Sequence, residues 1–174
     1  MTTANKLTLL RIALIPVFLG VLYAGFPGCK YWALGIFIVA SLTDFLDGYI
    51  ARHYNQITNF GKFMDPLADK VLVMAAMCWF VECGQMPGWA LAIVLLREFA
   101  VSGMRLVAVE QGKVIAAAWS GKVKTFSTMI ALCLMMLEIP KTLNLICIIV
   151  IVATTLYSGV EYFIKNVEVF KNAD

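Results

Sequence analysis

Four of the chain's five aspartates lie between residues 44 and 69, namely Asp44, Asp47, Asp65 and Asp69. The other acidic residues are scattered singly along the sequence. Neighbouring carboxylates repel one another unless cations lie among them, and an all-oxygen ligand set without histidine or cysteine suits Mg²⁺ or Mn²⁺. These residues predict a site for two divalent cations. The plainer interpretation is a set of surface carboxylates at helix ends.

The spacing of these aspartates places each pair on one helix face. On a helix that turns about 100° per residue, a face about 100° wide collects Asp44, Asp47, Gly48 and Ala51, with Arg52 at its edge. The next helix places Gly61, Asp65 and Asp69 four residues apart, and Pro66 suits its first turn. Small residues let backbone approach a ligand, and arginine neutralises phosphate. Two metals beside an arginine indicate phosphoryl transfer.

The elements that must position these residues are long apolar segments. Of 174 residues, 61% are hydrophobic and only 14% are charged, which excludes a soluble domain and a nucleic-acid-binding protein. We expect an all-α integral membrane protein with six transmembrane helices, since the apolar runs are long and unbroken. The expected segments are Leu7–Ala24, Tyr31–Ile50, Leu67–Cys83, Gly88–Val109, Gly121–Glu138 and Leu143–Ile164. The polar segment Arg52–Phe60 is the expected first cytoplasmic loop.

Basic residues set the expected orientation in a cell membrane. One side of the membrane collects Lys6, Arg52, Lys62, Lys113, Lys122, Lys124, Lys165 and Lys171, whereas the opposite loops hold Lys30 and Lys141. The positive-inside rule then places both termini in the cytoplasm and the aspartate cluster at the cytoplasmic face. No linker or repeat interrupts the chain, so residues 1–174 are expected to form a single domain.

The aspartate segments resemble the signature DxxDGxxAR…GxxxDxxxD of the CDP-alcohol phosphatidyltransferases, and every named position matches. Members of this family use an alcohol to displace CMP from a CDP-linked lipid. The resemblance implies that the four aspartates bind two divalent cations, Mg²⁺ or Mn²⁺, with Asp69 also the general base. It implies a CDP site formed by Asp44, Asp47, Gly48, Ala51, Arg52, Gly61 and Asp65. It also implies a homodimer.

A second group of polar residues lies in the fourth and fifth expected helices. Arg97, Val101 and Arg105 are four residues apart, and Glu98 is placed to pair with one arginine. Gly121-Lys122-Val-Lys124-Thr125 opens the fifth helix. Two arginines on one membrane-helix face are costly unless they bind something. An anion pocket for a phosphorylated alcohol is one interpretation, and snorkelling or positive-inside residues are the other.

These two stretches resemble the REFxVSGLR and GKxKT segments of one branch of that family, the bacterial phosphatidylglycerophosphate synthases. The opening residues Asn5, Thr8, Arg11 and Ile12 also resemble that branch. The resemblance implies transfer from CDP-diacylglycerol to sn-glycerol 3-phosphate, with Arg105 and Lys122 on the acceptor phosphate and Arg97 and Lys124 as further candidates. Asn5, Thr8 and Arg11 are candidate headgroup or nucleotide contacts, and Asn5 and Thr8 are equally suited to a helix start.

Two alternatives remain open. Another member of the family would use phosphatidylglycerol, serine or an inositol phosphate as its acceptor. A divalent-cation carrier or channel would use the carboxylates as a transit site, but the third, fifth and sixth expected spans carry no acidic residue deep in the membrane beyond the cluster, and a pathway needs polar groups along its length.

Overall fold

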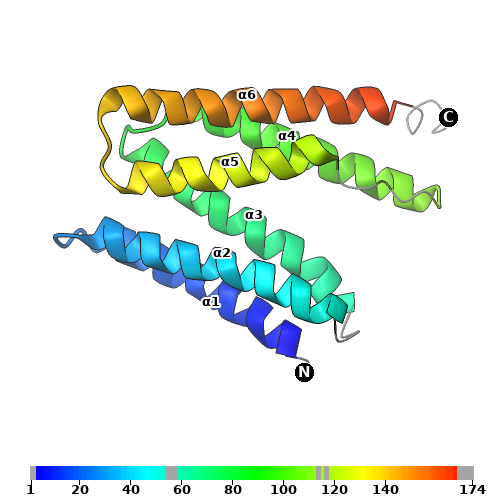
Figure 1. Ribbon diagram of the computed structural model, residues 1–174, viewed down its shortest axis with the longest axis horizontal. Helices are drawn as coiled ribbons and strands as arrows, with labels where there is room; N and C mark the ends of the chain where they lie inside the picture. Colours follow the sequence, from blue (N-terminus) through cyan, green and yellow to red (C-terminus); the bar gives the residue numbers. More distant parts are fainter. Residues whose placement is uncertain (1–2, 54–58, 113–114, 116–117, 168–174) are drawn as a thin grey trace. The chain divides into compact units, whose positions relative to one another are not determined.

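The computed structural model describes residues 3–53, 59–112, 115 and 118–167, and within them the side chains other than those of 3–6, 44–53, 59–63, 65 and 66. In these residues the chain is helical throughout its regular elements, and no strand occurs (Figure 1). The helices are α1 (Thr3–Tyr23), α2 (Cys29–His53), α3 (Asn59–Glu82), α4 (Gly88–Glu110), α5 (Trp119–Met136) and α6 (Lys141–Lys165). The all-α expectation is therefore confirmed for the described part of the chain.

Helix α1 begins at Thr3, four residues before the expected Leu7, and both helix boundaries around the aspartate signature also differ from the sequence-based expectation. Helix α2 runs on to His53, so Arg52 lies on a helix and not in a loop. Helix α3 begins at Asn59, well before Leu67, which places Pro66 inside the helix and not in its first turn. Apolar runs locate the part of a helix that avoids water. Apolar runs do not reveal the polar residues at either end that continue the same helix.

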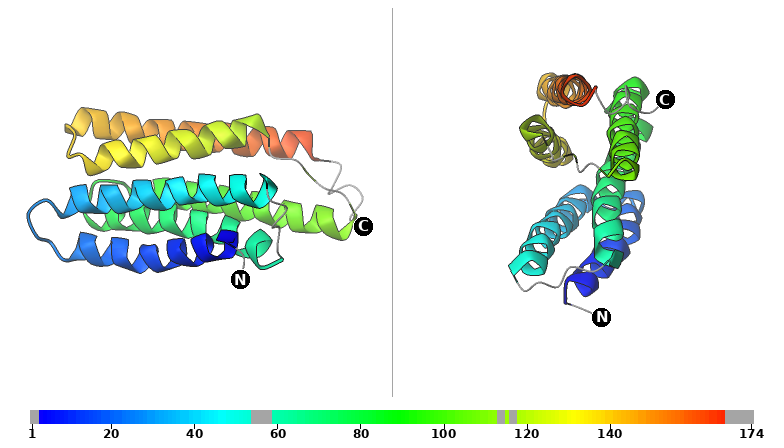
Figure 2. Two further views of the ribbon diagram at one scale, coloured as in Figure 1. Left: turned by 60° about the horizontal axis from the view of Figure 1, so that its bottom comes forward. Right: turned by 90° about the vertical axis from the view of Figure 1, so that its right-hand side faces the viewer.

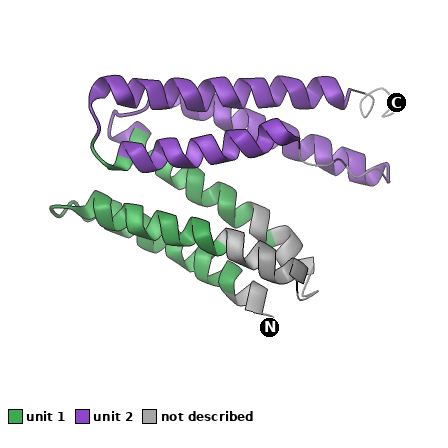
Figure 3. Ribbon diagram, in the orientation of Figure 1, with its two compact units in different colours: residues 1–80, 136–138 green, residues 81–135, 139–174 purple. Residues whose placement is uncertain are grey.

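The chain divides into two compact units (Figure 3). The first consists of residues 1–80 and 136–138, and the second of residues 81–135 and 139–174. The first unit holds α1, α2 and most of α3, and the second holds α4, α6 and nearly all of α5.

In the first unit α1 and α2 pack along one another (Figure 2). Phe18 and Phe37 are fully buried between them, with ring centroids 5.9 Å apart. Ala33 and Ala40, four and three residues to either side of Phe37, are also fully buried, because alanine lets two helix backbones approach closely. This packing fixes α2, the helix that carries the first half of the signature.

An ion pair lies elsewhere in the first unit. Lys30 is at the start of α2, and its Nζ lies 2.9 Å from Glu138 Oε1. The same nitrogen lies 5.8 Å from the ring centroid of Trp79 in α3. Glu138 has a φ of 57°, a left-handed conformation uncommon outside glycine. That conformation serves the reversal of the chain between α5 and α6.

In the second unit α4 packs against α6. The buried face of α4 carries Ala90, Val94, Glu98, Val101, Met104 and Ala108. The facing stripe of α6 is apolar towards its start and polar towards its end, where Thr155, Ser158 and Tyr162 are buried. The polar end of this interface is where α4 carries its two arginines.

Every helix also presents large apolar side chains outward. Leu96, Phe99 and Leu106 of α4 are each exposed over about two thirds or more of their surface. The other five helices expose large apolar side chains over about half or more of their surface, for example Leu10, Leu42, Leu67, Phe126 and Ile164. Within the described residues, α6 is the helix that is both long enough and apolar enough throughout to cross a bilayer. Its mean hydropathy over the most apolar window is 2.2.

Candidate active site

Both halves of the aspartate signature lie on helices, as their spacing predicts. Asp44, Asp47, Gly48, Ala51 and Arg52 belong to α2, and Gly61, Asp65 and Asp69 belong to α3. The side chain of Asp69 is described and is partly buried. Of the other signature residues, those with side chains lie outside the described ones, namely Asp44, Asp47, Ala51, Arg52 and Asp65. The four-carboxylate grouping and the CDP site therefore stay predictions.

Helix α1 is anchored to α2 just before the signature begins. Arg11 is completely buried, and its Nε donates a hydrogen bond to the backbone oxygen of Ala40 at 3.3 Å. The Thr43 hydroxyl donates to the same oxygen at 2.6 Å. Thr8 is also buried, whereas the side chain of Asn5 lies outside the described ones. The contact of Asn5, Thr8 and Arg11 with nucleotide or headgroup stays a prediction. The hydrogen bond from Arg11 to Ala40 also gives this arginine a role in holding α1 against α2.

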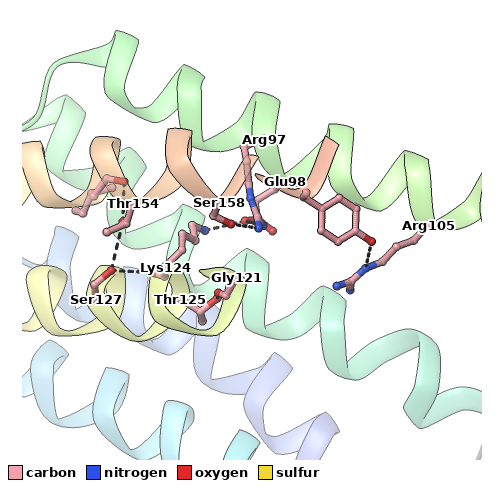
Figure 4. A network of polar contacts seen from close by, with 11 residues as sticks. Arg97, Glu98, Arg105, Gly121, Lys124, Thr125, Ser127, Thr154 and Ser158 are labelled. Carbon is pink, nitrogen blue, oxygen red and sulfur yellow. Dashed lines mark hydrogen bonds and ion pairs between the residues drawn. The ribbon is translucent and has the colours of Figure 1, made fainter. Parts of the chain in front are cut away.

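Two basic residues of the second unit, Arg97 and Lys124, meet around one carboxylate, that of Glu98 (Figure 4). Glu98 accepts a hydrogen bond from Arg97 Nη1 at 3.0 Å and another from Lys124 Nζ at 2.7 Å, both on Oε1. All three side chains are largely buried: Arg97 is 12% exposed, Glu98 is 11% exposed and Lys124 is 5% exposed. The predicted pairing of Glu98 with an arginine is confirmed. The added lysine links α4 to α5.

Arg97 is enclosed by all three helices of this unit. Its Nη2 donates a hydrogen bond to the Ser158 hydroxyl of α6. Two glycines leave room for its side chain: a Cβ placed on Gly159 would lie 3.3 Å from Arg97 Cγ, and one on Gly121 would lie 3.5 Å from Nη2. Both terminal nitrogens of Arg97 are therefore already paired within the protein, in a space that larger residues would narrow.

Arg105 has a different environment, although it lies two turns further along the same helix. Its Nε donates a hydrogen bond to the Tyr162 hydroxyl at 3.0 Å, and its guanidinium carbon lies 5.6 Å from the centroid of that ring. Arg105 itself is exposed, and so is Lys122. The two residues favoured for the acceptor phosphate are thus the two accessible cations of the set.

Comparison with known proteins decides the family. The sequence matches the profile of the CDP-alcohol phosphatidyltransferases over residues 1–157. The chain belongs to the CDP-alcohol phosphatidyltransferase family. The family resemblance inferred from the signature is confirmed, and the match extends from α1 into α6.

Curated relatives within the CDP-alcohol phosphatidyltransferase family carry a more specific name. A Bacillus subtilis protein named CDP-diacylglycerol–glycerol-3-phosphate 3-phosphatidyltransferase is 42% identical over 98% of this chain and 97% of its own length. Proteins of the same name from Escherichia coli and Rickettsia bellii are 43% and 39% identical, over 72% and 76% of this chain and 71% and 74% of their own lengths. The similarity is nearly end to end for the first of them.

Two polar residues that contact the arginines of α4 were not predicted from the sequence of this family member. Ser158 and Tyr162 lie four residues apart in α6, in a run that reads as an ordinary apolar helix, yet they bond Arg97 and Arg105. The spacing of polar residues along α6 could have indicated them. Thr154, Ser158 and Tyr162 share one face of α6, and the arginines of α4 need partners somewhere within the apolar bundle.

Proposed function

We propose that this chain transfers the phosphatidyl group of CDP-diacylglycerol to sn-glycerol 3-phosphate, giving phosphatidylglycerophosphate and CMP. The observation that carries the proposal is the near end-to-end similarity to a relative named for this reaction. The complete aspartate signature supports it, and so does the supply of accessible cations at Arg105 and Lys122. A phosphorylated acceptor requires cations of this kind.

In the reaction, the acceptor hydroxyl oxygen attacks the phosphorus that bears diacylglycerol, and the bond from that phosphorus to the CMP oxygen breaks. Asp69 accepts the proton of the attacking hydroxyl. Arg105 and Lys122 hold the acceptor's phosphate, Arg97 and Lys124 add positive charge to the same unit, and Arg52 pairs with a phosphate of the nucleotide. The remaining signature residues, Gly48, Ala51 and Gly61, leave space for the CDP moiety.

Two divalent cations, Mg²⁺ or Mn²⁺, complete the proposed site. The donor set fits them, because Asp44, Asp47, Asp65 and Asp69 offer only carboxylate oxygens, which are the ligands that these hard cations prefer. When bound, the cations would polarise the phosphorus and offset charge on the departing CMP. Asp44, Asp47 and Asp65 would serve as ligands, and Asp69 would serve as ligand and base.

The metal requirement gives a direct prediction. Activity of the purified protein should fall at least about a hundredfold in excess EDTA, because the signature carboxylates would lose their counter-ions. Adding Mg²⁺ or Mn²⁺ beyond the chelator should restore it. CMP release measured across both steps checks this, and full activity in excess chelator would contradict the two-metal proposal.

We further propose that the six helices span the cell membrane, with both termini and the active site on the cytoplasmic side. The outward apolar residues of all six helices support this arrangement, as does the apolar length of α6. The asymmetry of lysine and arginine supports the orientation. A lipid donor can then enter from the bilayer while the soluble acceptor arrives from the cytoplasm. The homodimer implied by the family resemblance stays a prediction.

The acceptor is tested by offering alternatives to one preparation. Purified protein with CDP-diacylglycerol in detergent should release CMP with sn-glycerol 3-phosphate, and at least about tenfold more slowly with phosphatidylglycerol, serine or inositol phosphate. Serine lacks a phosphate, phosphatidylglycerol carries two acyl chains, and inositol phosphate carries its phosphate on a larger ring. Chromatography of the lipid product checks each case. Turnover only with a non-phosphorylated alcohol would contradict the proposed acceptor.

A further inference from the structure

One face of α6 meets the polar residues of the other two helices in the second unit. Thr154, Ser158 and Tyr162 are four residues apart and fall within about 80° of arc on a helix. Thr154 accepts a hydrogen bond from Ser127 of α5 at 3.3 Å, while Ser158 and Tyr162 accept from Arg97 and Arg105 of α4 (Figure 4). The last two contacts have different consequences for the two arginines.

At Arg97 the contact closes the guanidinium in. Nη1 is bonded to Glu98 and Nη2 to Ser158, so both terminal nitrogens are used within the protein. The side chain is 12% exposed. Arg97 therefore links α4 to α6 and has no terminal nitrogen left over for a ligand.

At Arg105 the contact fixes one edge of the guanidinium and leaves the other open. Tyr162 bonds Nε, which is the inner nitrogen of the group. Among the described residues no hydrogen bond engages Nη1 or Nη2, and Figure 4 shows them extending away from the phenol. The guanidinium is planar, so fixing Nε with the ring beside it also fixes the direction of the two terminal nitrogens.

Tyr162 is itself held rigidly. It is only 2% exposed and packs in a cluster with Val101 and Met104 of α4, against which Ile115 and Ala118 also lie. A buried ring in a packed core keeps one rotamer. Its hydroxyl is thus a fixed acceptor at the edge of the core, next to an arginine that is otherwise exposed.

We propose that Tyr162 is the positioning residue of the acceptor site: its hydroxyl and ring orient Arg105 so that Nη1 and Nη2 together face the phosphate of the acceptor alcohol. The inference rests on the proposed function, in which Arg105 binds that phosphate. A long side chain loses rotamer freedom when it binds a ligand, and holding Nε in place beforehand reduces that loss. Tyr162 does not touch the reacting atoms.

The test removes one oxygen. In Tyr162→Phe the buried ring and its packing remain, and Arg105 loses its acceptor. KM for sn-glycerol 3-phosphate should rise about 10- to 150-fold, the range for a lost hydrogen bond to a charged group. The kcat and the KM for CDP-diacylglycerol should stay within about twofold of wild type. Tyr157→Phe is the matched control, because Tyr157 lies on the same helix, is 68% exposed, and should leave all three constants unchanged.

A double-variant cycle separates positioning from a merely structural role. Arg105→Ala should raise the same KM more than Tyr162→Phe does, and adding Tyr162→Phe to Arg105→Ala should have no further effect, since the hydroxyl acts only through the arginine. Independent, multiplying effects would overturn the proposal. So would an unchanged KM in Tyr162→Phe, or a fall in kcat and thermal stability without a change in KM.

The same measurements distinguish this inference from the function on which it rests. If Arg105→Ala leaves the KM for sn-glycerol 3-phosphate unchanged, the assignment of Arg105 to the acceptor phosphate fails, and the positioning role fails with it. If Arg105→Ala raises that KM and Tyr162→Phe does not, the acceptor site stands and the positioning role alone is overturned.

Discussion

Replacing Asp69 by asparagine should leave a folded protein that releases CMP at least about a thousandfold more slowly than wild type. The substitution removes the proton acceptor for the attacking hydroxyl, and a positioned general base contributes about 10²–10⁴ in rate. It also removes a proposed ligand of one cation, which adds to the loss. The amide has nearly the shape of the carboxylate, so the packing of α3 around this partly buried position should persist.

The rate of CMP release per folded protein checks this prediction, with the thermal unfolding midpoint measured on the same sample. Glu82→Gln is the matched control, because Glu82 is an exposed carboxylate at the end of the same helix and outside the signature. It should retain wild-type activity. An Asp69→Asn protein that turns over at more than about a tenth of the wild-type rate would remove Asp69 from the role of base.

The largest effect on stability is expected at Glu98. Glu98→Gln should lower the free energy of unfolding by about 3 kcal/mol, because two cations with little exposure, Arg97 and Lys124, would lose their shared anion. The loss of stability comes from leaving the positive charges of Arg97 and Lys124 buried without a negative partner. Glu98→Gln combined with Lys124→Met, which removes one of the two charges, should therefore recover part of the loss.

Unfolding in detergent micelles, followed by circular dichroism, checks both variants. Glu161→Gln is the control, since Glu161 pairs with Lys165 one turn away on α6 and the lysine side chain is 63% exposed. Removing that exposed ion pair should change the unfolding midpoint little. A Glu98→Gln protein as stable as wild type, or a double variant less stable than the single one, would contradict the account of the network.

The number and order of the helices could be predicted from sequence because each contains a long apolar run. The ends could not, and α3 shows why. Its first turns carry Asn59, Lys62 and Asp65, which are polar and invisible to hydropathy, although they are helical. The same limitation placed Arg52 in a loop, whereas it continues α2.

Those residues of the site whose types are rare in an apolar chain could be predicted from the sequence. Aspartates concentrated in an apolar chain stand out, and so do the paired arginines of α4. Ser158 and Tyr162 do not, because serine and tyrosine are ordinary in membrane helices and their role depends on which face of α6 meets α4. Lys124 was expected among phosphate ligands or solvated cations, but its contact with Glu98 depends on packing between α4 and α5.

The regular spacing of Thr154, Ser158 and Tyr162 limits which changes in length α6 can accept. Inserting or deleting one residue between Thr154 and Tyr162 would turn the rest of the helix by about 100°. Tyr162 would then leave the face that meets Arg105, even in a helix of unchanged hydrophobicity. The outward residues of α6, such as Leu156 and Val160, are exposed and can vary among apolar types. We therefore expect this helix to tolerate substitution on its outer face far better than a change of register.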